Sequence, residues 1–169
     1  MAAPPGKYFR CFPEETCHHR LCQCIYAHPS NIWLYAFIEG EERQKTARAK
    51  ELLEASRMLI VSTQVINEVC VNLLKKAQFS EQQVQQLIES FYAKYMVIEL
   101  SKVLLLIASA LRAQYTFSFW DSTIVSSALQ ADASVLYSED MQDGLVVENR
   151  MRIINPFTKV QPTGAQSRI

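Results

Sequence analysis

The chain has 169 residues, of which 49% are hydrophobic and 20% are charged, and this composition suits one globular domain with a core of its own. Its formal net charge is zero and its isoelectric point is near 6.8, so it lacks the overall basic charge of most nucleic-acid-binding proteins. The longest apolar run, Val103 to Leu111, is too short to span a bilayer and predicts a buried helix. Because the first residues also lack the apolar stretch of a secretory signal, we expect a soluble protein of the reducing cytoplasm.

The first 30 residues differ in composition from the rest. They contain four of the five cysteines, all three histidines and four of the six prolines. The spacing of these cysteines does not form the paired C-x2-4-C pattern of structural zinc sites, which argues against zinc. The alternatives are a weakly packed leader and a start or reading frame that differs from the native one. We therefore assign residues 1–24 to a poorly ordered leader, 25–157 to the folded domain and 158–169 to a flexible tail.

From residue 24 onward, short apolar strands alternate with longer helical segments. The helical segments have good helix formers and apolar residues at helical spacing. The predicted strands cover residues 24–27, 58–62, 96–100, 134–138 and 152–155. One predicted helix begins at the turn with Asn31, and the other predicted helices cover residues 41–57, 62–77, 79–95, 101–115 and 121–130.

The apolar stripes predict which side of each helix faces the core. Ser62 or Thr63, and later Ser80, are placed to cap the helices that follow them. We expect the inward residues to be Ala47, Leu52 and Leu53 in helix 41–57, Val65, Ile66, Val69 and Leu73 in helix 62–77, and Val84, Leu87, Ile88 and Phe91 in helix 79–95.

Strands that alternate with helices need crossover connections, which produce parallel strands with helices on both faces. The sequence therefore predicts an α/β fold, a three-layer α/β/α sandwich with a small, mainly parallel sheet. In such folds ligands bind outside the carboxyl ends of the strands, so polar residues at those ends are the candidates for function.

Acidic side chains follow two of the predicted strands. A turn that Gly144 closes contains Glu139, Asp140 and Asp143. These acids are candidates for a functional site, and the alternative interpretation is a polar turn without a function. Glu68 lies off the apolar stripe of its helix, and its alternative is a solvated surface glutamate.

Asp121 lies at the start of a predicted helix, in the segment FSFWDSTIVSSAL. Ile124, Val125 and Ala128 follow it at i+3, i+4 and i+7, so its carboxylate extends the apolar stripe toward the core side. The alternative is a helix N-cap. The nearby aromatic residues Phe119 and Trp120, with Trp33 and Tyr35, could stack on bases, although packing in the core explains most aromatic residues.

In combination, SNIWLYAF, the helix with NEV, FWDSTIVSSAL, VLYSEDMQDG and RIINPF resemble the PIN domain, especially the VapC-type toxins of toxin–antitoxin pairs. The resemblance covers residues 25–157, and its last two motifs are the most specific. It implies a metal-dependent endoribonuclease in which carboxylates at the strand ends hold Mg²⁺ or Mn²⁺. It also implies an RNA substrate, a cognate antitoxin as a partner, a homodimer and no membrane association.

The resemblance carries over to particular residues. It implies that Glu68, Asp121 and Asp140 are the catalytic, metal-binding acids, that Asp143 matches a less constant acidic position, and that Ser30, Asn31, Ser122 and Ser138 are supporting residues. Hard divalent ions prefer oxygen ligands, so a few carboxylates suffice without histidine or cysteine. Without the leader and the tail after Phe157 the chain has 12 basic and 15 acidic residues, so the metal has to supply positive charge at the reacting phosphate, while Lys and Arg contact the backbone.

The opening motif departs from the family. The PIN domain has an aspartate directly before the Ser/Thr-Asn pair, and this chain has Pro29 there. Proline offers neither a carboxylate nor a backbone N–H, so we expect weaker metal binding and slower turnover. A weakened domain that binds RNA or an antitoxin is therefore the alternative. A phosphotransfer protein ranks last, because it too needs an acid after the first strand.

Overall fold

The computed structural model of the chain describes residues 25–27, 29–38, 42–55 and 58–158, and the side chains of residues 31–38, 42–54 and 58–158. The predicted leader, with its four cysteines, and the predicted tail beyond Thr158 lie outside the described residues. The elements in chain order are β1 (Ile25–Ala27), α1 (Pro29–Phe37), α2 (Arg43–Ala55), β2 (Leu59–Ser62), α3 (Thr63–Lys76), α4 (Glu81–Lys94), β3 (Met96–Ile98), α5 (Lys102–Tyr115), α6 (Phe119–Gln130), β4 (Val135–Tyr137), β5 (Val146–Val147) and β6 (Met151–Ile154).

The strands form one sheet in the order β3-β2-β1-β4-β6-β5. The pairs β3-β2, β2-β1, β1-β4 and β4-β6 are parallel, and β5 pairs antiparallel with β6. The prediction of a mainly parallel sheet is therefore confirmed. Strand β5 was missed, because two residues are too few to show a period; Gly144 makes the turn before it at a φ of +79°, which a glycine adopts without strain.

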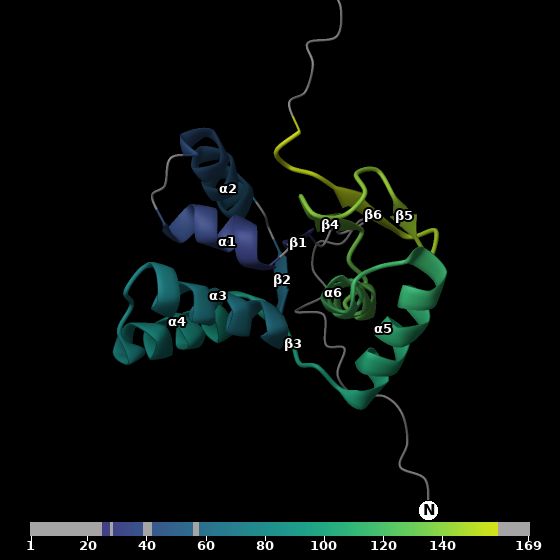
Figure 1. The fold of residues 1–169 in the computed structure, drawn as a ribbon, viewed down its shortest axis with the longest axis horizontal. Helices are drawn as coiled ribbons and strands as arrows, with labels where there is room; N and C mark the ends of the chain where they lie inside the picture. The colour runs from purple at the N-terminus through teal and green to yellow at the C-terminus, as the bar shows by residue number, and fades with distance from the viewer. Residues whose placement is uncertain (1–24, 28, 39–41, 56–57, 159–169) are drawn as a thin grey trace, which may run out of the picture.

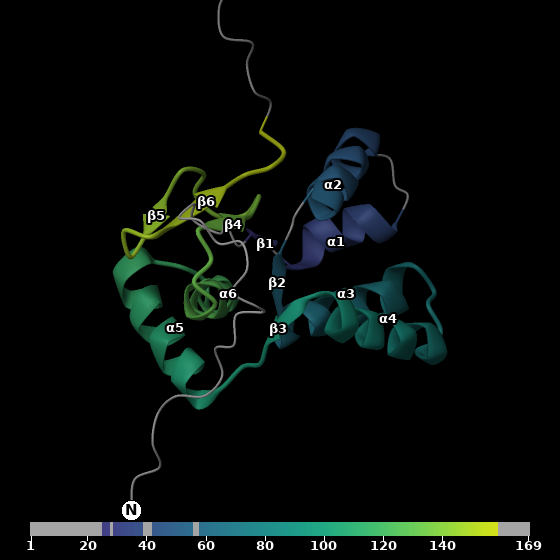
Figure 2. The same cartoon turned by 180° about the vertical axis from the view of Figure 1, so that it is seen from behind.

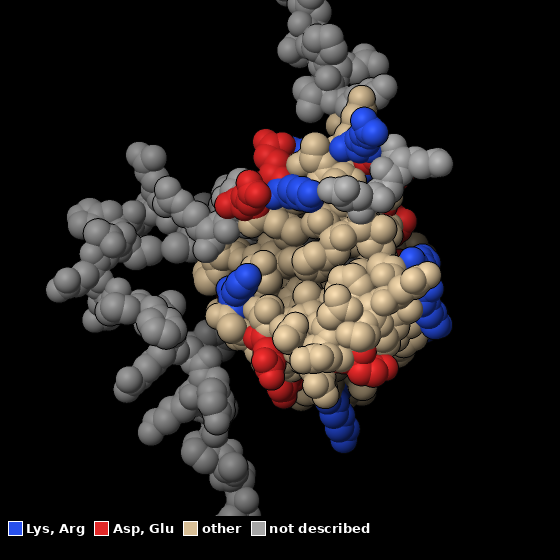
Figure 3. Space-filling model, turned by 90° about the vertical axis from the view of Figure 1, so that its left-hand side faces the viewer, with Lys and Arg blue, Asp and Glu red and all other residues tan. Residues whose placement is uncertain are grey.

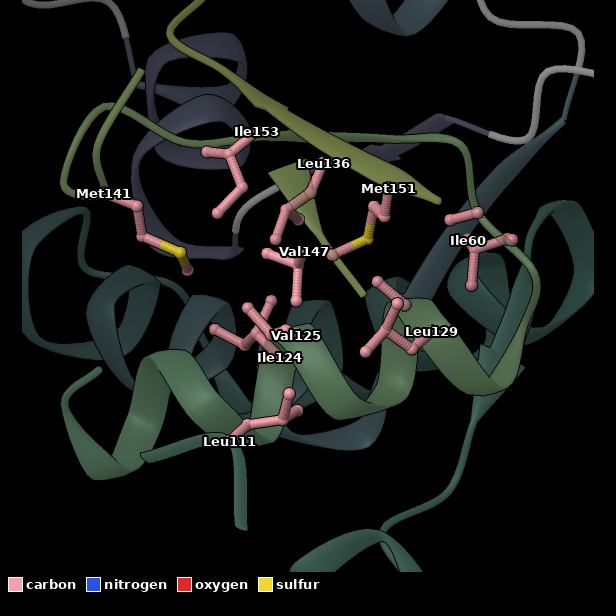
Figure 4. Packing of buried hydrophobic residues seen from close by; sticks show 12 residues of the cluster. Ile60, Leu111, Ile124, Val125, Leu129, Leu136, Met141, Val147, Met151 and Ile153 are labelled. Carbon is pink, nitrogen blue, oxygen red and sulfur yellow. The ribbon is translucent and has the colours of Figure 1, made fainter. Parts of the chain in front are cut away.

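Helices cover both faces of the sheet, which confirms the three-layer α/β/α prediction (Figure 1). Helices α1 to α4 lie on one side of the strands and α5 and α6 on the other, and the view from behind shows the same division (Figure 2). Strand β2 joins the two cores because its side chains alternate between faces. Ile60 packs with residues of α5 and α6 (Figure 4), whereas Leu59 and Val61 pack with residues of α1, α3 and α4.

Local sequence signals set the starts of α3 and α4. The Ser62 Oγ accepts a hydrogen bond from the Val65 N–H at 3.3 Å, which confirms Ser62 as the N-cap of α3. Ser80 and Gln83 form a capping box at the start of α4, which confirms the prediction that Ser80 caps this helix. The predicted stripe of α3, Val65, Ile66, Val69 and Leu73, is buried.

Other burial predictions are wrong in detail. In α2 Ala47 is exposed and Ala49 is fully buried instead, and in α4 Ile88 is exposed while Val84 and Phe91 are buried. The apolar run in α5 is only partly buried, because α5 packs through one face, with Leu104, Ala108 and Leu111, and leaves other apolar side chains in solvent. Those exposed side chains include Val103 and Leu106, which are 61% and 62% exposed.

No single helix of the described residues is long and apolar enough to cross a membrane. Helices α5 and α6 meet the length and composition requirement only as a pair, and they are bent by 115° at their junction. Residues 122–129 of α6 are buried in the protein core.

Candidate metal and RNA site

Most of the predicted site residues follow the carboxyl ends of three neighbouring strands, whereas Asp121 and Ser122 lie on α6, which follows α5. Strand β1 lies between β2 and β4 in the sheet. Helix α1 starts directly after β1, helix α3 starts directly after β2, and the turn with Asp140 follows β4. Because parallel strands end at the same edge, these three segments meet there.

A contact between side chains far apart in the sequence joins two of these segments. The Nδ2 of Asn31, in the first turn of α1, donates a hydrogen bond to the Oδ2 of Asp140 at 3.3 Å. Asp140 itself is exposed, so its carboxylate remains open to solvent on its other sides. The structure thus brings Asn31 and Asp140, two of the residues predicted for the site, into direct contact.

The helices that carry Glu68 and Asp121 are joined through residues that the sequence interpretation missed. The Nε2 of Gln64 donates to the Oε1 of Glu68 at 3.0 Å, and the Oε1 of Gln64 accepts a hydrogen bond from the Oγ1 of Thr123. Gln64 and Thr123 are 4% and 1% exposed, so this polar link is buried and its groups are satisfied by each other. It fixes the first turn of α3 to the first turns of α6, two residues after Asp121.

Asp121 has a local partner as well. Its backbone N–H donates to the Oγ of Ser118 at 3.1 Å, and the Ser118 hydroxyl donates to the Asp121 Oδ2 at 2.6 Å. Ser118 is the N-cap of α6, so the alternative that Asp121 is the N-cap is wrong. The Asp121 side chain is partly exposed at the start of the helix, with the buried part of α6 directly after it.

Ser138 and Asp143 shape the backbone around the turn. The Oγ of Ser138, which is fully buried, accepts hydrogen bonds from the N–H groups of Asp140 and Met141 at 3.2 and 3.1 Å. The Oδ1 of the exposed Asp143 accepts the Asn155 N–H at 2.8 Å. Both groups thus hold the Asp140 turn and the end of β6 in place.

Two other predicted supporting residues contribute less to the site. The Ser122 hydroxyl is buried and donates to the Phe119 carbonyl at 2.7 Å, inside its own helix. Ser30 and Pro29 lie in the first turn of α1, where proline suits the first helical position. Their side chains lie outside the described residues.

The aromatic residues near this edge divide into two groups. Trp33 is 1% exposed and packs edge-on against Phe91 and Tyr95, as core packing predicts. Phe119 and Trp120 are 45% and 60% exposed and pack against each other at a centroid distance of 5.4 Å. Core packing therefore does not account for these two rings, which lie next to Asp121.

The segments that meet at this edge of the sheet also lie in the part of the chain that matches a known family. The family model for the PIN domain matches residues 30–142, which include α1 from its second residue, α3, α6 and the Asp140 turn. This chain belongs to the PIN domain family. A comparison with curated proteins gives no match.

Solved structures share the fold of this PIN domain at low sequence identity. A toxin–antitoxin complex from Klebsiella pneumoniae aligns with a TM-score of 0.60 and 20% identity, over 80% of this chain and 98% of that one. VapC20 of Mycobacterium tuberculosis, a sarcin–ricin loop cleaving toxin, aligns with a TM-score of 0.54 and 15% identity, over 66% of this chain and 86% of that one. At these identities the likeness concerns the fold.

The acids of this PIN domain have the right chemistry for a hard divalent ion, because carboxylate oxygens are the ligands that Mg²⁺ and Mn²⁺ prefer. Their arrangement is looser than a ligand set. Among the described residues no group of three or more His, Cys, Asp and Glu side chains lies close enough to hold a metal ion. Glu68 is instead held by Gln64, Asp121 by Ser118 and Asp140 by Asn31. The donor types fit the ion, whereas the three carboxylates do not form a ligand group in this structure.

Proposed function

We propose that this PIN domain protein is a metal-dependent endoribonuclease of the VapC toxin type, which hydrolyses RNA phosphodiester bonds with Mg²⁺ or Mn²⁺. The observation that supports it is the meeting of the family's motif segments at one edge of the sheet, where Asn31 contacts Asp140 and the Gln64–Thr123 link joins the helices of Glu68 and Asp121. Family membership supports the same class of activity.

Each residue has a role in this proposal. Glu68, Asp121 and Asp140 would hold the ion, and Asn31 orients the Asp140 carboxylate from α1. When bound, the ion lowers the pKa of a water molecule and neutralises charge on the phosphate oxygens. Asp143 is a further candidate ligand of the ion, and its Oδ1 also braces the turn by accepting the Asn155 N–H.

Metal-stimulated RNA cleavage by the purified protein tests the proposal directly. We expect the protein to cleave a structured RNA when Mn²⁺ or Mg²⁺ is present and to stop when EDTA removes the ion. The measurement is the appearance of fragments on a denaturing gel, with Ca²⁺ as a control for charge screening alone. No stimulation by Mn²⁺ across several RNAs contradicts the endoribonuclease proposal.

The exposed ring of Trp120 supports an RNA substrate, because a base stacks on an aromatic face without regard to its sequence. We expect Trp120→Ala to weaken RNA binding by roughly 1–3 kcal/mol, which is about 5- to 150-fold in Kd. Fluorescence anisotropy with a labelled RNA measures it. Tyr92→Ala is the matched control, since Tyr92 is 50% exposed on α4, away from α6. Equal Kd values for both variants contradict a stacking role.

A weakened PIN domain that binds RNA or an antitoxin is the second candidate. Pro29 at the position of the first acid favours it, as does the lack of a three-carboxylate group among the described residues. The same RNA experiments separate the two candidates. Binding that depends on Trp120 without metal-stimulated cleavage supports the weakened domain.

A cognate antitoxin is the protein partner we propose, together with a homodimeric state in the cytoplasm. Figure 3 shows the face on the side of α1 to α4, where uncharged residues fill the centre and Lys, Arg, Asp and Glu lie around it. A charge-poor centre with a charged rim is typical of a protein interface, whereas contact with an RNA backbone needs clustered positive charge. The solved toxin–antitoxin complex supports the same kind of partner.

A further inference from the structure

A cluster of charged and aromatic side chains joins α1, α2 and the turn after β4. The Nζ of Lys45, on α2, lies 3.0 Å from the Oη of Tyr35 on α1 and 3.2 Å from the Oε2 of Glu139. The Tyr35 hydroxyl donates to the Oε1 of the same glutamate at 3.3 Å. Glu42 adds a second carboxylate at 3.2 Å from Lys45. Neither Tyr35 nor Lys45 has a role in the proposed metal site.

The segment after β6 closes the cluster on its other side. The Phe157 ring packs edge-on against the Tyr35 ring at a centroid distance of 5.4 Å, and the Lys45 Nζ lies 5.6 Å from the centre of the Phe157 ring. The same Nζ lies 5.0 Å from the Tyr35 ring centre. Lys45 thus contacts three separate parts of the chain: α1, the turn after β4 and the residues after β6.

This cluster is better shielded than an ordinary surface ion pair. The Glu139 side chain is 15% exposed and the Lys45 side chain 31%. The hydrogen bond with Tyr35, followed by those with Glu139 and Glu42, raises the pKa of Lys45, so the ammonium form is retained at neutral pH. Burial is the main cause that raises the pKa of Tyr35, so its hydroxyl also remains protonated. Both donors are therefore present over the physiological pH range.

The position of Glu139 gives the cluster its significance. Glu139 directly precedes Asp140, and their partners Tyr35 and Asn31 lie four residues apart on one face of α1. One helix therefore holds two successive carboxylates, while Lys45 holds the first of them from α2. A shift of Glu139 would move the Asp140 backbone with it.

We propose that Tyr35 and Lys45 are positioning residues, which hold Glu139 so that the Asp140 carboxylate stays at the carboxyl edge of the sheet beside Asn31. The metal-binding consequence rests on the proposed function, whereas the positioning itself does not. The two are tested by separate measurements.

Hydrogen exchange of the full-length protein measures the positioning. In Lys45→Met we expect the amides of residues 139–143 to exchange about tenfold faster than in the parent, with the amides of β2 and β4 unchanged. Tyr35→Phe keeps the ring against Phe157 and loses only the hydroxyl, and we expect a smaller change in the same direction. Lys45→Arg retains the positive charge and the N–H donors, so residues 139–143 of this variant should exchange as slowly as in the parent. Lys50→Met, an exposed lysine on the same helix, is the control.

Mn²⁺ titration followed by EPR measures the consequence for the metal. We expect Lys45→Met to raise the Kd for Mn²⁺ about tenfold, a typical effect of losing a residue that orients a ligand, and to lower kcat with an unchanged KM for RNA. Unchanged exchange at residues 139–143 in both Lys45→Met and Tyr35→Phe overturns the positioning proposal, as does faster exchange throughout the sheet. If the parent binds no Mn²⁺, the proposed function fails, and the exchange measurement still decides the positioning.

Discussion

Asp140→Asn is expected to abolish metal-stimulated RNA cleavage, with a loss of at least about 100-fold in kcat/KM. Asparagine has the same shape, and its Oδ1 still accepts the hydrogen bond from Asn31, so the variant removes one negative charge with little other change. Because Asp140 is exposed, the free energy of unfolding should change by less than about 0.5 kcal/mol. Cleavage assays with Mn²⁺ and a urea denaturation curve provide the two measurements.

Asp132→Asn is the matched control for this prediction. Asp132 is also exposed, but it lies before β4, at the opposite end of the strand, and pairs with Arg150 at 3.1 Å. It should retain full activity. Asp121→Asn should show the loss that Asp140→Asn shows, because it too removes one negative charge from the proposed metal site. Its Oδ1 can still accept the hydrogen bond from Ser118, so the helix start should be kept. Cleavage at the parent rate by both Asp121→Asn and Asp140→Asn would refute a carboxylate-bound metal in the reaction.

The sequence predicts those parts of the fold that depend on local order. The stripe of α3 and the caps at Ser62 and Ser80 were predicted correctly, because a cap and a 3.6-residue period lie within one short window. Burial of α5 was overpredicted, since an apolar composition does not reveal that a helix packs through one face. Residues such as Leu106 stay exposed because α5 packs on α6 and none of the other described elements covers its outer side.

The supports of the candidate site depend on contacts that span most of the chain. Lys45 and Glu139 are 94 residues apart, and Gln64 and Thr123 are 59 apart, so no window of sequence contains either pair. A partial signal was present for Gln64, which precedes Glu68 by one helical turn. Lys45 had none, because a lysine on a mixed-charge helix is ordinarily solvated. The acids were found through the family motifs, and the residues that hold them were found through the fold.

These supports are independent of the missing acid. The contact between Asn31 and Asp140 and the cluster of Tyr35, Lys45 and Glu139 lie between α1, α2 and the turn after β4. None of them involves the residue at position 29. If Pro29 does occupy the family's first acidic position, as the sequence resemblance implies, the frame around the proposed metal site is kept without that acid.

Pro29→Asp should raise activity for this reason. Position 29 begins α1 at the carboxyl end of β1, between the segments of Glu68 and Asp140 in the sheet order. A fourth carboxylate there adds an oxygen ligand to three acids that do not converge by themselves. We expect affinity for Mn²⁺ and the cleavage rate to rise about 10- to 100-fold, the range over which the surroundings of a metal site change these quantities. An aspartate in the first turn also favours the helix through its dipole.

Pro29→Asn separates the charge from the loss of proline. Asparagine has nearly the shape of aspartate and also suits a helix start, but its neutral amide is a much weaker ligand for a hard cation. Mn²⁺ titration by EPR and the cleavage assay, applied to both variants, should therefore show a rise for Pro29→Asp alone. Equal behaviour of the two variants would mean that position 29 lies outside the metal site and that the opening motif of the family is aligned one or more residues away from it.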